Sequence, residues 1–264
     1  MPIEVVIHGA LGRMGREVVA AVCKDPQLKP VGAVDVEAEG PWLPLPGGQH
    51  SIPVSSDLDS LLTQTKPQVV VDFSVADAAM YVARLAIQQR INVVTGTTGL
   101  PPDALNEMDK LARANEVGVI VAPNFALGAV VMGHLAKIAA RYFEHAEIIE
   151  MHHEQKLDAP SGTALSTARA MAEARGKSFR HPETEKETLK GTRGGEVEGI
   201  SVHSVRLPGL MAHQEIIFGT SGQTLTIRHD TINRECYMPG VILAIKKAVE
   251  LKGLTYGLEN LLDL

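Results

Sequence analysis

Ile3-Glu-Val-Val-Ile-His-Gly-Ala-Leu-Gly-Arg-Met-Gly15 is the stretch that decides the fold. Residues 3–8 are mostly apolar and β-branched, which predicts a strand. Three glycines follow at Gly-x-x-Gly-x-x-Gly spacing, and residues 16–24 predict a helix. Glycines let the backbone approach a pyrophosphate, and a helix N-terminus favours its negative charge. The stretch therefore indicates a phosphate-binding entry, although three glycines alone are also compatible with a simple tight turn.

Asp35 supports the dinucleotide interpretation. It ends the next apolar run, 30–35, and lies 20 residues after Gly15. A dinucleotide-binding fold places a carboxylate at this position, on the hydroxyls of the adenosine ribose. The alternative is an ordinary exposed acid at a strand end. The glycine loop and the acid together favour dinucleotide binding.

The next hundred or so residues alternate between predicted strands and helices. This alternation is typical of an α/β fold with a Rossmann-like, doubly wound parallel sheet. Predicted strands cover 68–73, 91–95 and 117–121, and predicted helices cover 57–64, 74–89 with Ser74 as cap, and 101–114. Residues 36–56 are rich in Gly, Pro and Ser and predict a surface loop. Residues 96–99 and 122–125 follow strands, at the sheet edge where ligands bind in such folds.

The pattern changes near Phe125. After a helix to about Tyr142, a strand over 147–150 and a helix over 164–174 are expected, followed by a polar excursion over 176–199. Three β-rich runs then cover 200–207, 213–220 and 223–230, with Ser221-Gly222 as a hairpin turn. These runs predict a second α+β domain with a mixed or antiparallel sheet. A final amphipathic helix, 241–252, is expected to pack back on the first domain.

Composition narrows the class of protein. The chain has 264 residues, with 45% hydrophobic and 21% charged residues, which are ordinary globular values. A net charge of −6 argues against a broad nucleic-acid-binding face. Neither an apolar run long enough for a membrane span nor a secretory signal pattern is visible, so the cytoplasm is the default location. Cys23 and Cys236 lie in apolar contexts and are expected to be buried thiols in a reducing compartment.

The stretch Glu150-Met-His-His-Glu-Gln-Lys-Leu-Asp-Ala-Pro-Ser-Gly-Thr-Ala164 concentrates the chemistry. Two histidines, a lysine and an aspartate precede a helix that Ser161 can cap. The free amides of Gly162 and Thr163 would then point at an anion. The layout suits a small carboxylate-bearing substrate that must receive a proton. A histidine pair alone is more often a surface or core feature than a site.

Taken together, Gly9–Gly15, Gly96-Thr-Thr-Gly99 and the 150–164 stretch resemble the dihydrodipicolinate reductase (4-hydroxy-tetrahydrodipicolinate reductase) family. The His-His-x-x-Lys-x-Asp-Ala-Pro-Ser-Gly-Thr block is highly specific, and the resemblance covers essentially the whole chain. It implies a reductase of the diaminopimelate and lysine pathway that uses NADH or NADPH on a cyclic dicarboxylate. It also implies a dinucleotide-binding domain, residues 1–125 with 234–264, and a substrate-binding and oligomerisation domain, 126–233, of a homotetramer.

The resemblance also implies roles for individual residues. His152 and Lys156 match the catalytic acid groups of the family. The expected substrate contacts are His153, Ser161, Gly162 and Thr163. The expected cofactor contacts are Gly9, Ala10, Leu11, Gly12, Arg13, Met14, Asp35, Gly96, Thr97, Thr98, Ala122, Pro123, Asn124 and Phe125. Many members carry an arginine just after the ribose-binding acid, where it can meet a 2′-phosphate, whereas this chain has Val36. The preference between NADH and NADPH therefore stays open.

The residue chemistry agrees with that reaction. Reducing a cyclic enamine or imine needs a hydride at one carbon and a proton at its neighbour, and the nicotinamide brings the hydride. Lys156 can anchor a carboxylate and donate a proton. His152 can pass protons, because a histidine titrates near neutral pH.

Three rival interpretations remain at this point. The chain could be another two-domain dehydrogenase acting on an amino or hydroxy acid, which the His-His-x-x-Lys block disfavours. It could be a nucleotide sensor that binds the cofactor without oxidising it. A metal site at His152, His153 and Asp158 is disfavoured by the adjacent lysine and by the lack of nearby cysteines, so no metal is predicted.

Overall fold

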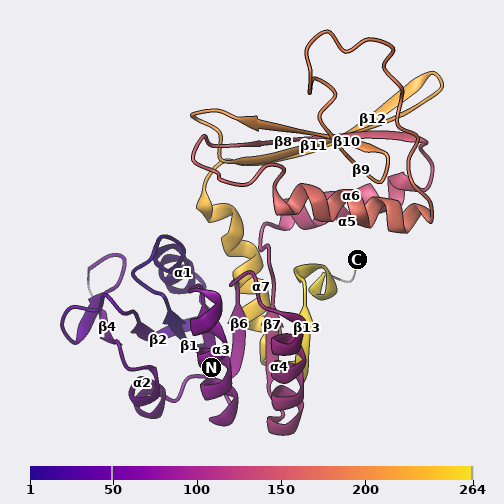
Figure 1. Ribbon diagram of the computed structural model, residues 1–264. Helices are drawn as coiled ribbons and strands as arrows, with labels where there is room; N and C mark the ends of the chain where they lie inside the picture. Colours follow the sequence, from indigo (N-terminus) through magenta and orange to yellow (C-terminus); the bar gives the residue numbers. More distant parts are fainter. Residues whose placement is uncertain (49, 263) are drawn as a thin grey trace. The chain divides into compact units, whose positions relative to one another are not determined.

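The structure is a computed structural model that describes residues 1–48, 50–262 and 264. Its contacts divide the chain into two units (Figure 1). The terminal unit comprises Met1–Leu127 and Arg234–Leu264, and the central unit comprises Gly128–Asn233. Each unit has its own sheet and its own hydrophobic core.

The terminal unit is built on an eight-stranded sheet in the order β13-β7-β6-β5-β1-β2-β4-β3. All neighbouring strands are parallel except β3 and β4, which confirms the predicted doubly wound sheet. The strands are β1 (Ile3–His8), β2 (Leu28–Val34), β3 (Trp42–Pro44), β4 (Ser51–Ser55), β5 (Val69–Asp72), β6 (Asn92–Thr95), β7 (Gly118–Val121) and β13 (Gly253–Tyr256). The helices are α1 (Arg13–Lys24), α2 (Leu58–Thr65), α3 (Ala76–Gln88), α4 (Pro102–Asn115) and α7 (Met238–Ala248), with short 3-10 turns at Arg234–Tyr237 and Leu258–Leu261.

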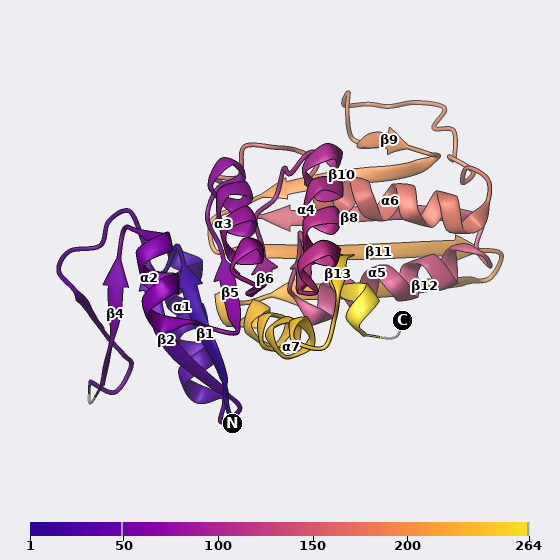
Figure 2. The same ribbon diagram turned by 90° about the horizontal axis from the view of Figure 1, so that it is seen from below.

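Both faces of this sheet are covered by helices. Helices α2, α3 and α4 pack on one face, and α1 and α7 lie on the other (Figure 2). Strand β5 reads Val-Val-Val-Asp and is buried throughout, as expected for a parallel strand covered on both sides. The predicted return of the C-terminal helix to the first domain is confirmed, since α7 packs against α1 and β6. The chain then adds β13 at the sheet edge, a strand that the sequence pattern did not reveal.

Several local predictions in this unit were wrong. Residues 36–56, predicted as a loop, contain β3 and β4, and β4 pairs with β2 through only two residue pairs. Proline is unusual inside a sheet, so Pro44 in the edge strand β3 and Pro53 in β4 made these strands look like a loop. Helix α3 is capped at Val75 rather than at Ser74. Helix α1 starts at Arg13, three residues earlier than predicted.

The central unit has a five-stranded mixed sheet in the order β12-β11-β8-β10-β9. Strands β8 and β10 are parallel, and the other neighbours are antiparallel. The elements are α5 (Leu127–Ala140), β8 (His145–His152), α6 (Gly162–Arg175), β9 (Gly195–Val197), β10 (Ile200–Arg206), β11 (Ala212–Thr220) and β12 (Gln223–Thr231). Helices α5 and α6 cover one face (Figure 1). The predicted Ser221-Gly222 hairpin turn is confirmed.

Strand β8 separates the two faces of this sheet. Its buried residues alternate, with Ala146, Ile148 and Glu150 on the helix-covered face. Glu147 lies on the other face, where it contacts Arg193 of the segment 176–199. The segment begins on the helix-covered face, where Phe179 joins the core, and its middle stands off the opposite face (Figure 1). This segment contains β9 near its end, while residues 176–194 form no helix or strand.

Two further observations bear on earlier expectations. Cys23 and Cys236 are half-buried rather than buried, and burial raises the pKa of the Cys23 thiol. Across residues 1–48, 50–262 and 264, no helix combines the length and apolar character needed to cross a bilayer.

Candidate active site

The glycine loop leads from β1 into α1. Gly9 has a φ of +75°, and a Cβ on Gly15 would lie 2.0 Å from the Gly9 carbonyl oxygen, so side chains are excluded at both positions. The N-cap residue Gly12 has no side chain to accept hydrogen bonds from the first-turn amides of α1. That turn also carries no acidic residue. These features fit a pyrophosphate at this helix N-terminus.

Asp35 follows β2 and is buried beside this loop. Its carboxylate accepts hydrogen bonds from the Leu11 amide at 2.8 Å and from the Glu37 amide at 3.0 Å. The acid therefore shapes the glycine loop as well as lying where a ribose is expected. Val36, the next residue, is 91% exposed and brings no charge to this position.

Asp72 organises the neighbouring strand ends. Its fully buried carboxylate accepts hydrogen bonds from the His8 ring at 2.7 Å and from the hydroxyls of Ser74, Thr95 and Thr97 at 2.6, 2.9 and 3.0 Å. Burial opposes ionisation of this carboxyl, but the hydrogen bonds from His8 and the hydroxyls outweigh it and lower its pKa. Asp72 thereby ties the end of β1 to the loop that follows β6.

No sequence motif pointed to this cluster around Asp72. Its signal is an aspartate that ends an otherwise apolar, fully buried strand, because such a charge requires several hydrogen-bonding partners.

The predicted cofactor contacts lie at one edge of the terminal sheet. They follow β1, β2, β6 and β7, whose parallel carboxyl ends share that edge. Phe73, after β5, packs its ring 5.5 Å from that of Phe125, centroid to centroid. The Phe73 ring also fills the space that a side chain on Gly96 would need, with one ring carbon 2.2 Å from a Cβ built there. Asn124 accepts a hydrogen bond from the Ala126 amide at 2.9 Å.

In the central unit, β8 extends to His152 rather than ending at Glu150 as predicted. The His152 Nδ1 atom lies 2.5 Å from Glu150 Oε2. Burial favours the neutral ring and lowers the pKa of His152. The Glu150 carboxylate opposes this shift, while the cations Lys156 and Arg206 add to it.

Glu150 is fully buried and is held by several donors. Arg206 Nη2 donates to Oε1 at 2.8 Å, and Nη1 donates to Oε2 at 3.0 Å. The Ser161 amide also donates to Oε1, at 3.2 Å. Burial opposes ionisation of Glu150, but Arg206, Ser204 and His152 outweigh it and lower its pKa. Arg206 lies beside His152 in the pairing of β10 with β8, and no local sequence pattern indicates this contact, because it joins residues 54 positions apart.

The remaining predicted site residues lie on the segment from β8 to α6. Lys156 Nζ donates to Asp158 Oδ1 at 2.6 Å. The Ser161 hydroxyl accepts from the Ala164 amide at 3.2 Å, which confirms Ser161 as the cap of α6. His153, Gly162 and Thr163 are exposed. Arg206 also donates to the Asp158 carbonyl at 2.6 Å, so Glu150 and Arg206 together fix this segment.

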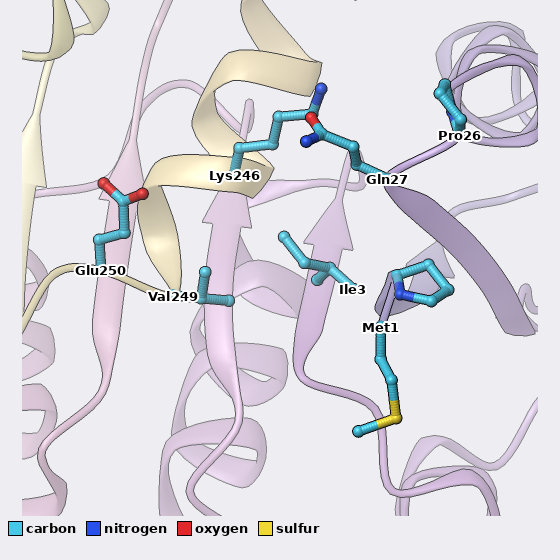
Figure 3. A pocket seen from close by; sticks show the side chains of 8 residues that line it. Met1, Ile3, Pro26, Gln27, Lys246, Val249 and Glu250 are labelled. Carbon is cyan, nitrogen blue, oxygen red and sulfur yellow. The ribbon is translucent and has the colours of Figure 1, made fainter.

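Two other features do not coincide with these residues. A cavity of about 600 Å³ lies at the amino end of the terminal sheet, between the start of β1 and the end of α7, and includes Ile3, Lys246 and Val249 in its lining (Figure 3). It is at the opposite end of the strands from the glycine loop. Among the residues that the structure describes, no three His, Cys, Asp or Glu side chains are grouped to hold a metal ion.

One unit has a doubly wound sheet with a glycine loop. The other gathers a histidine, a lysine and the N-terminus of α6, which Ser161 caps. Together these features define a Rossmann-type oxidoreductase. Residues 3–125 match the family description "Dihydrodipicolinate reductase, N-terminus", and residues 128–262 match "Dihydrodipicolinate reductase, C-terminus". The chain belongs to the dihydrodipicolinate reductase family, which confirms the resemblance inferred from its motifs.

Individual relatives agree along the whole chain. A 4-hydroxy-tetrahydrodipicolinate reductase of Dehalococcoides mccartyi is 57% identical over 263 residues, covering 100% of this chain and 99% of the relative. The Moorella thermoacetica enzyme of the same name is 50% identical, covering 99% of this chain and 98% of the relative. A dipicolinate-bound dihydrodipicolinate reductase from Paenisporosarcina is 44% identical with a TM-score of 0.89, covering 98% of this chain and 99% of that one.

Proposed function

We propose that the chain catalyses the NAD(P)H-dependent reduction of 4-hydroxy-tetrahydrodipicolinate to tetrahydrodipicolinate, in diaminopimelate and lysine biosynthesis. Full-length membership of a reductase family makes the chain an oxidoreductase. The observation that carries the substrate assignment is the segment Lys156–Thr163, where an ammonium group and the N-terminus of α6 lie beside a titratable histidine.

The terminal unit is the proposed dinucleotide-binding domain. Gly9 and Gly15 let the loop turn tightly into α1, whose N-terminus has no side-chain cap and is assigned to the pyrophosphate, and Asp35 lies at the end of β2 for the ribose. The loops at Gly96–Thr98 and Ala122–Phe125 complete the proposed contacts. When bound, the nicotinamide supplies the hydride.

The central unit is the proposed substrate-binding and oligomerisation domain. One carboxylate of the substrate is assigned to the amides of Gly162 and Thr163 and to the Thr163 hydroxyl. His153 and Lys156 are assigned to the other. Lys156 donates the proton to the carbon next to the one that receives hydride, and His152 relays protons. The hydroxyl first leaves as water together with a hydrogen from the neighbouring ring carbon, and one hydride and one proton then convert the resulting unsaturated ring to the product. The dipicolinate carried by the Paenisporosarcina relative supports a planar dicarboxylate ligand.

NADH and NADPH are both proposed as cofactors. Asp35 favours a free 2′-hydroxyl, and Val36 offers no cation to a phosphate, but the exposed Arg13 in the glycine loop can reach one. The preference is expected to stay within roughly a hundredfold, about 2.7 kcal/mol. Steady-state constants with each cofactor measure it, and a preference of many thousandfold would contradict dual use.

A coupled assay tests the proposed reaction. Aspartate semialdehyde, pyruvate and the preceding synthase generate the substrate, and the decay of NAD(P)H absorbance reports its reduction. The control omits the synthase. Absence of decay, with cofactor binding intact, would favour a nucleotide sensor. Decay with an amino or hydroxy acid instead would favour another dehydrogenase. Light scattering tests the proposed homotetramer, and cell fractionation tests the proposed cytoplasmic location.

A further inference from the structure

We propose that Glu150 is a positioning residue for the proposed reaction. It determines which ring nitrogen of His152 carries the proton. Its carboxylate accepts the Nδ1–H of the ring and leaves Nε2 as the atom that exchanges protons with the substrate. The expected effect of this tautomer on turnover rests on the proposed function. The structural part of the inference stands on contacts within the central unit alone.

The donors around Glu150 require its carboxylate to act as an acceptor, and this places a proton on His152 Nδ1. Oε1 accepts from the Ser161 amide and from Arg206 Nη2, and Oε2 accepts from Arg206 Nη1. A guanidinium group and a backbone amide can only donate. Both oxygens are therefore needed as acceptors in an ionised carboxylate, and Arg206 keeps that charge in place. The only complementary role for the His152 nitrogen 2.5 Å from Oε2 is that of a donor.

The same contacts align His152 with the proposed substrate anchor. Glu150 binds the Ser161 amide at the start of α6, and through Arg206 it holds the Asp158 carbonyl. The buried Glu150 carboxylate thus fixes the His152 ring and, directly or through Arg206, the loop at Asp158 and at Ser161. The charged groups that act on His152 are Glu150 on its own strand, Arg206 on β10 and Lys156 on the loop. The neighbouring strand β11 places Ala212 opposite His152 and the neutral Gln214 opposite Glu150.

Glu150→Gln is the informative variant. An amide has only one acceptor atom, whereas two sets of donors converge on this position. If the amide oxygen stays on Ser161 and Arg206, its NH₂ faces His152 and forces the ring to accept at Nδ1. If the oxygen turns to His152, the NH₂ opposes the helix cap. Loss of the negative charge also lowers the pKa of His152 further, because that charge stabilises the protonated ring.

Glu147→Gln is the matched control. Glu147 lies on the same strand but on the opposite face of the sheet, and it also pairs with an arginine and a histidine, Arg193 and His203. The Glu147→Gln variant therefore removes one carboxylate charge and its contacts with an arginine and a histidine, and leaves the contacts of His152 unchanged.

The experiment uses nitrogen-15 NMR of histidine-labelled full-length protein, without substrate, together with pH profiles of kcat. The wild type is expected to show the Nδ1–H tautomer at His152. Glu150→Gln should change that tautomer, lower kcat roughly tenfold to a hundredfold with a smaller change in KM, and move the alkaline fall of kcat to lower pH. Glu147→Gln should leave the His152 tautomer, kcat and the pH profile of kcat unchanged. Glu150→Asp, which keeps the charge, should recover part of kcat and the wild-type pH profile.

The outcomes separate the two proposals. An Nε2–H tautomer in the wild type would overturn the inference even if Glu150→Gln failed to fold. The expected tautomer in the wild type with unchanged kcat and pH profile in Glu150→Gln would also overturn the positioning role while leaving the proposed function intact. The expected tautomers without NAD(P)H oxidation would instead contradict the proposed reaction.

Discussion

Asp72 in the terminal unit and Glu150 in the central unit are both fully buried carboxylates, and each accepts a hydrogen bond from a histidine. They differ in their other donors. Asp72 is surrounded by hydroxyls, which rotate and can either donate or accept. Glu150 has the Ser204 hydroxyl as one partner, but its two oxygens are held by a guanidinium group and a backbone amide, which only donate. The first arrangement suits the holding of a loop, and the second fixes a charge and the position of a proton.

The largest expected effect tests whether proton transfer belongs to the central unit. Lys156→Ala should lower turnover roughly a hundredfold or more, the usual scale for a lost general acid. Cofactor binding, assigned to the terminal unit, should not change. Turnover in the coupled assay and NADH titration measure the two effects. Lys177→Ala, an exposed cation after α6, is the control and should behave as the wild type. Near-normal turnover in Lys156→Ala would remove this residue from the mechanism.

The next effect compares the two carboxylates directly. Asp72→Asn should destabilise the terminal unit by about 1 kcal/mol, because neighbouring hydroxyls can turn to match an amide. Glu150→Gln should destabilise the central unit by about 3 kcal/mol, because a buried charge loses its partner and donors oppose each other.

Denaturant-dependent hydrogen exchange measures this difference, with amides of β5 and β8 reporting on the separate units. Asp77→Asn and Glu154→Gln, which are exposed, serve as controls. Equal decreases in the free energy of unfolding for Asp72→Asn and Glu150→Gln would show that the type of donor around the carboxylate does not determine the loss of stability.

The fold was largely predictable, because its signals are local. Apolar parallel strands and their glycine-rich or capped connections each leave a pattern within a few residues, as in β1, β5 and the Ser161 cap. The edge strands β3 and β13, and β4 next to β3, were missed, since short strands with few paired residues carry little hydrophobic periodicity.

The site was predictable only in part. Contiguous motifs brought His152 and Lys156 to attention, and the catalytic roles assigned to them stay predictions. The partners that orient them come from sheet pairing, which a single sequence does not reveal. Arg206 reaches Glu150 from a strand that begins about forty residues after the motif ends. In the same way, Asp72 meets Thr95 and His8 only because β1, β5 and β6 are neighbours.

The smallest expected effect concerns Thr163, at the exposed start of α6. Pyridine-2,6-dicarboxylate should compete with the substrate, and its mono-acid relative should bind roughly ten- to a hundredfold more weakly, because one anchor is left unmatched. Thr163→Val should narrow this gap by a few-fold, the scale of one neutral hydrogen bond at about 1 kcal/mol. The helix itself should persist, since Thr167 donates to the backbone carbonyl of residue 163 and not to its side chain.

Inhibition constants of both acids on wild type, Thr163→Val and the exposed control Ser166→Ala measure the effect. A selective narrowing in Thr163→Val would assign one carboxylate to the start of α6. That would sharpen the contrast between the units, because the Thr97 hydroxyl serves an internal carboxylate of the protein while the Thr163 hydroxyl would serve a carboxylate of the ligand. Equal inhibition by the two acids in the wild type would mean that the turn binds no carboxylate, and the substrate assignment would have to be withdrawn.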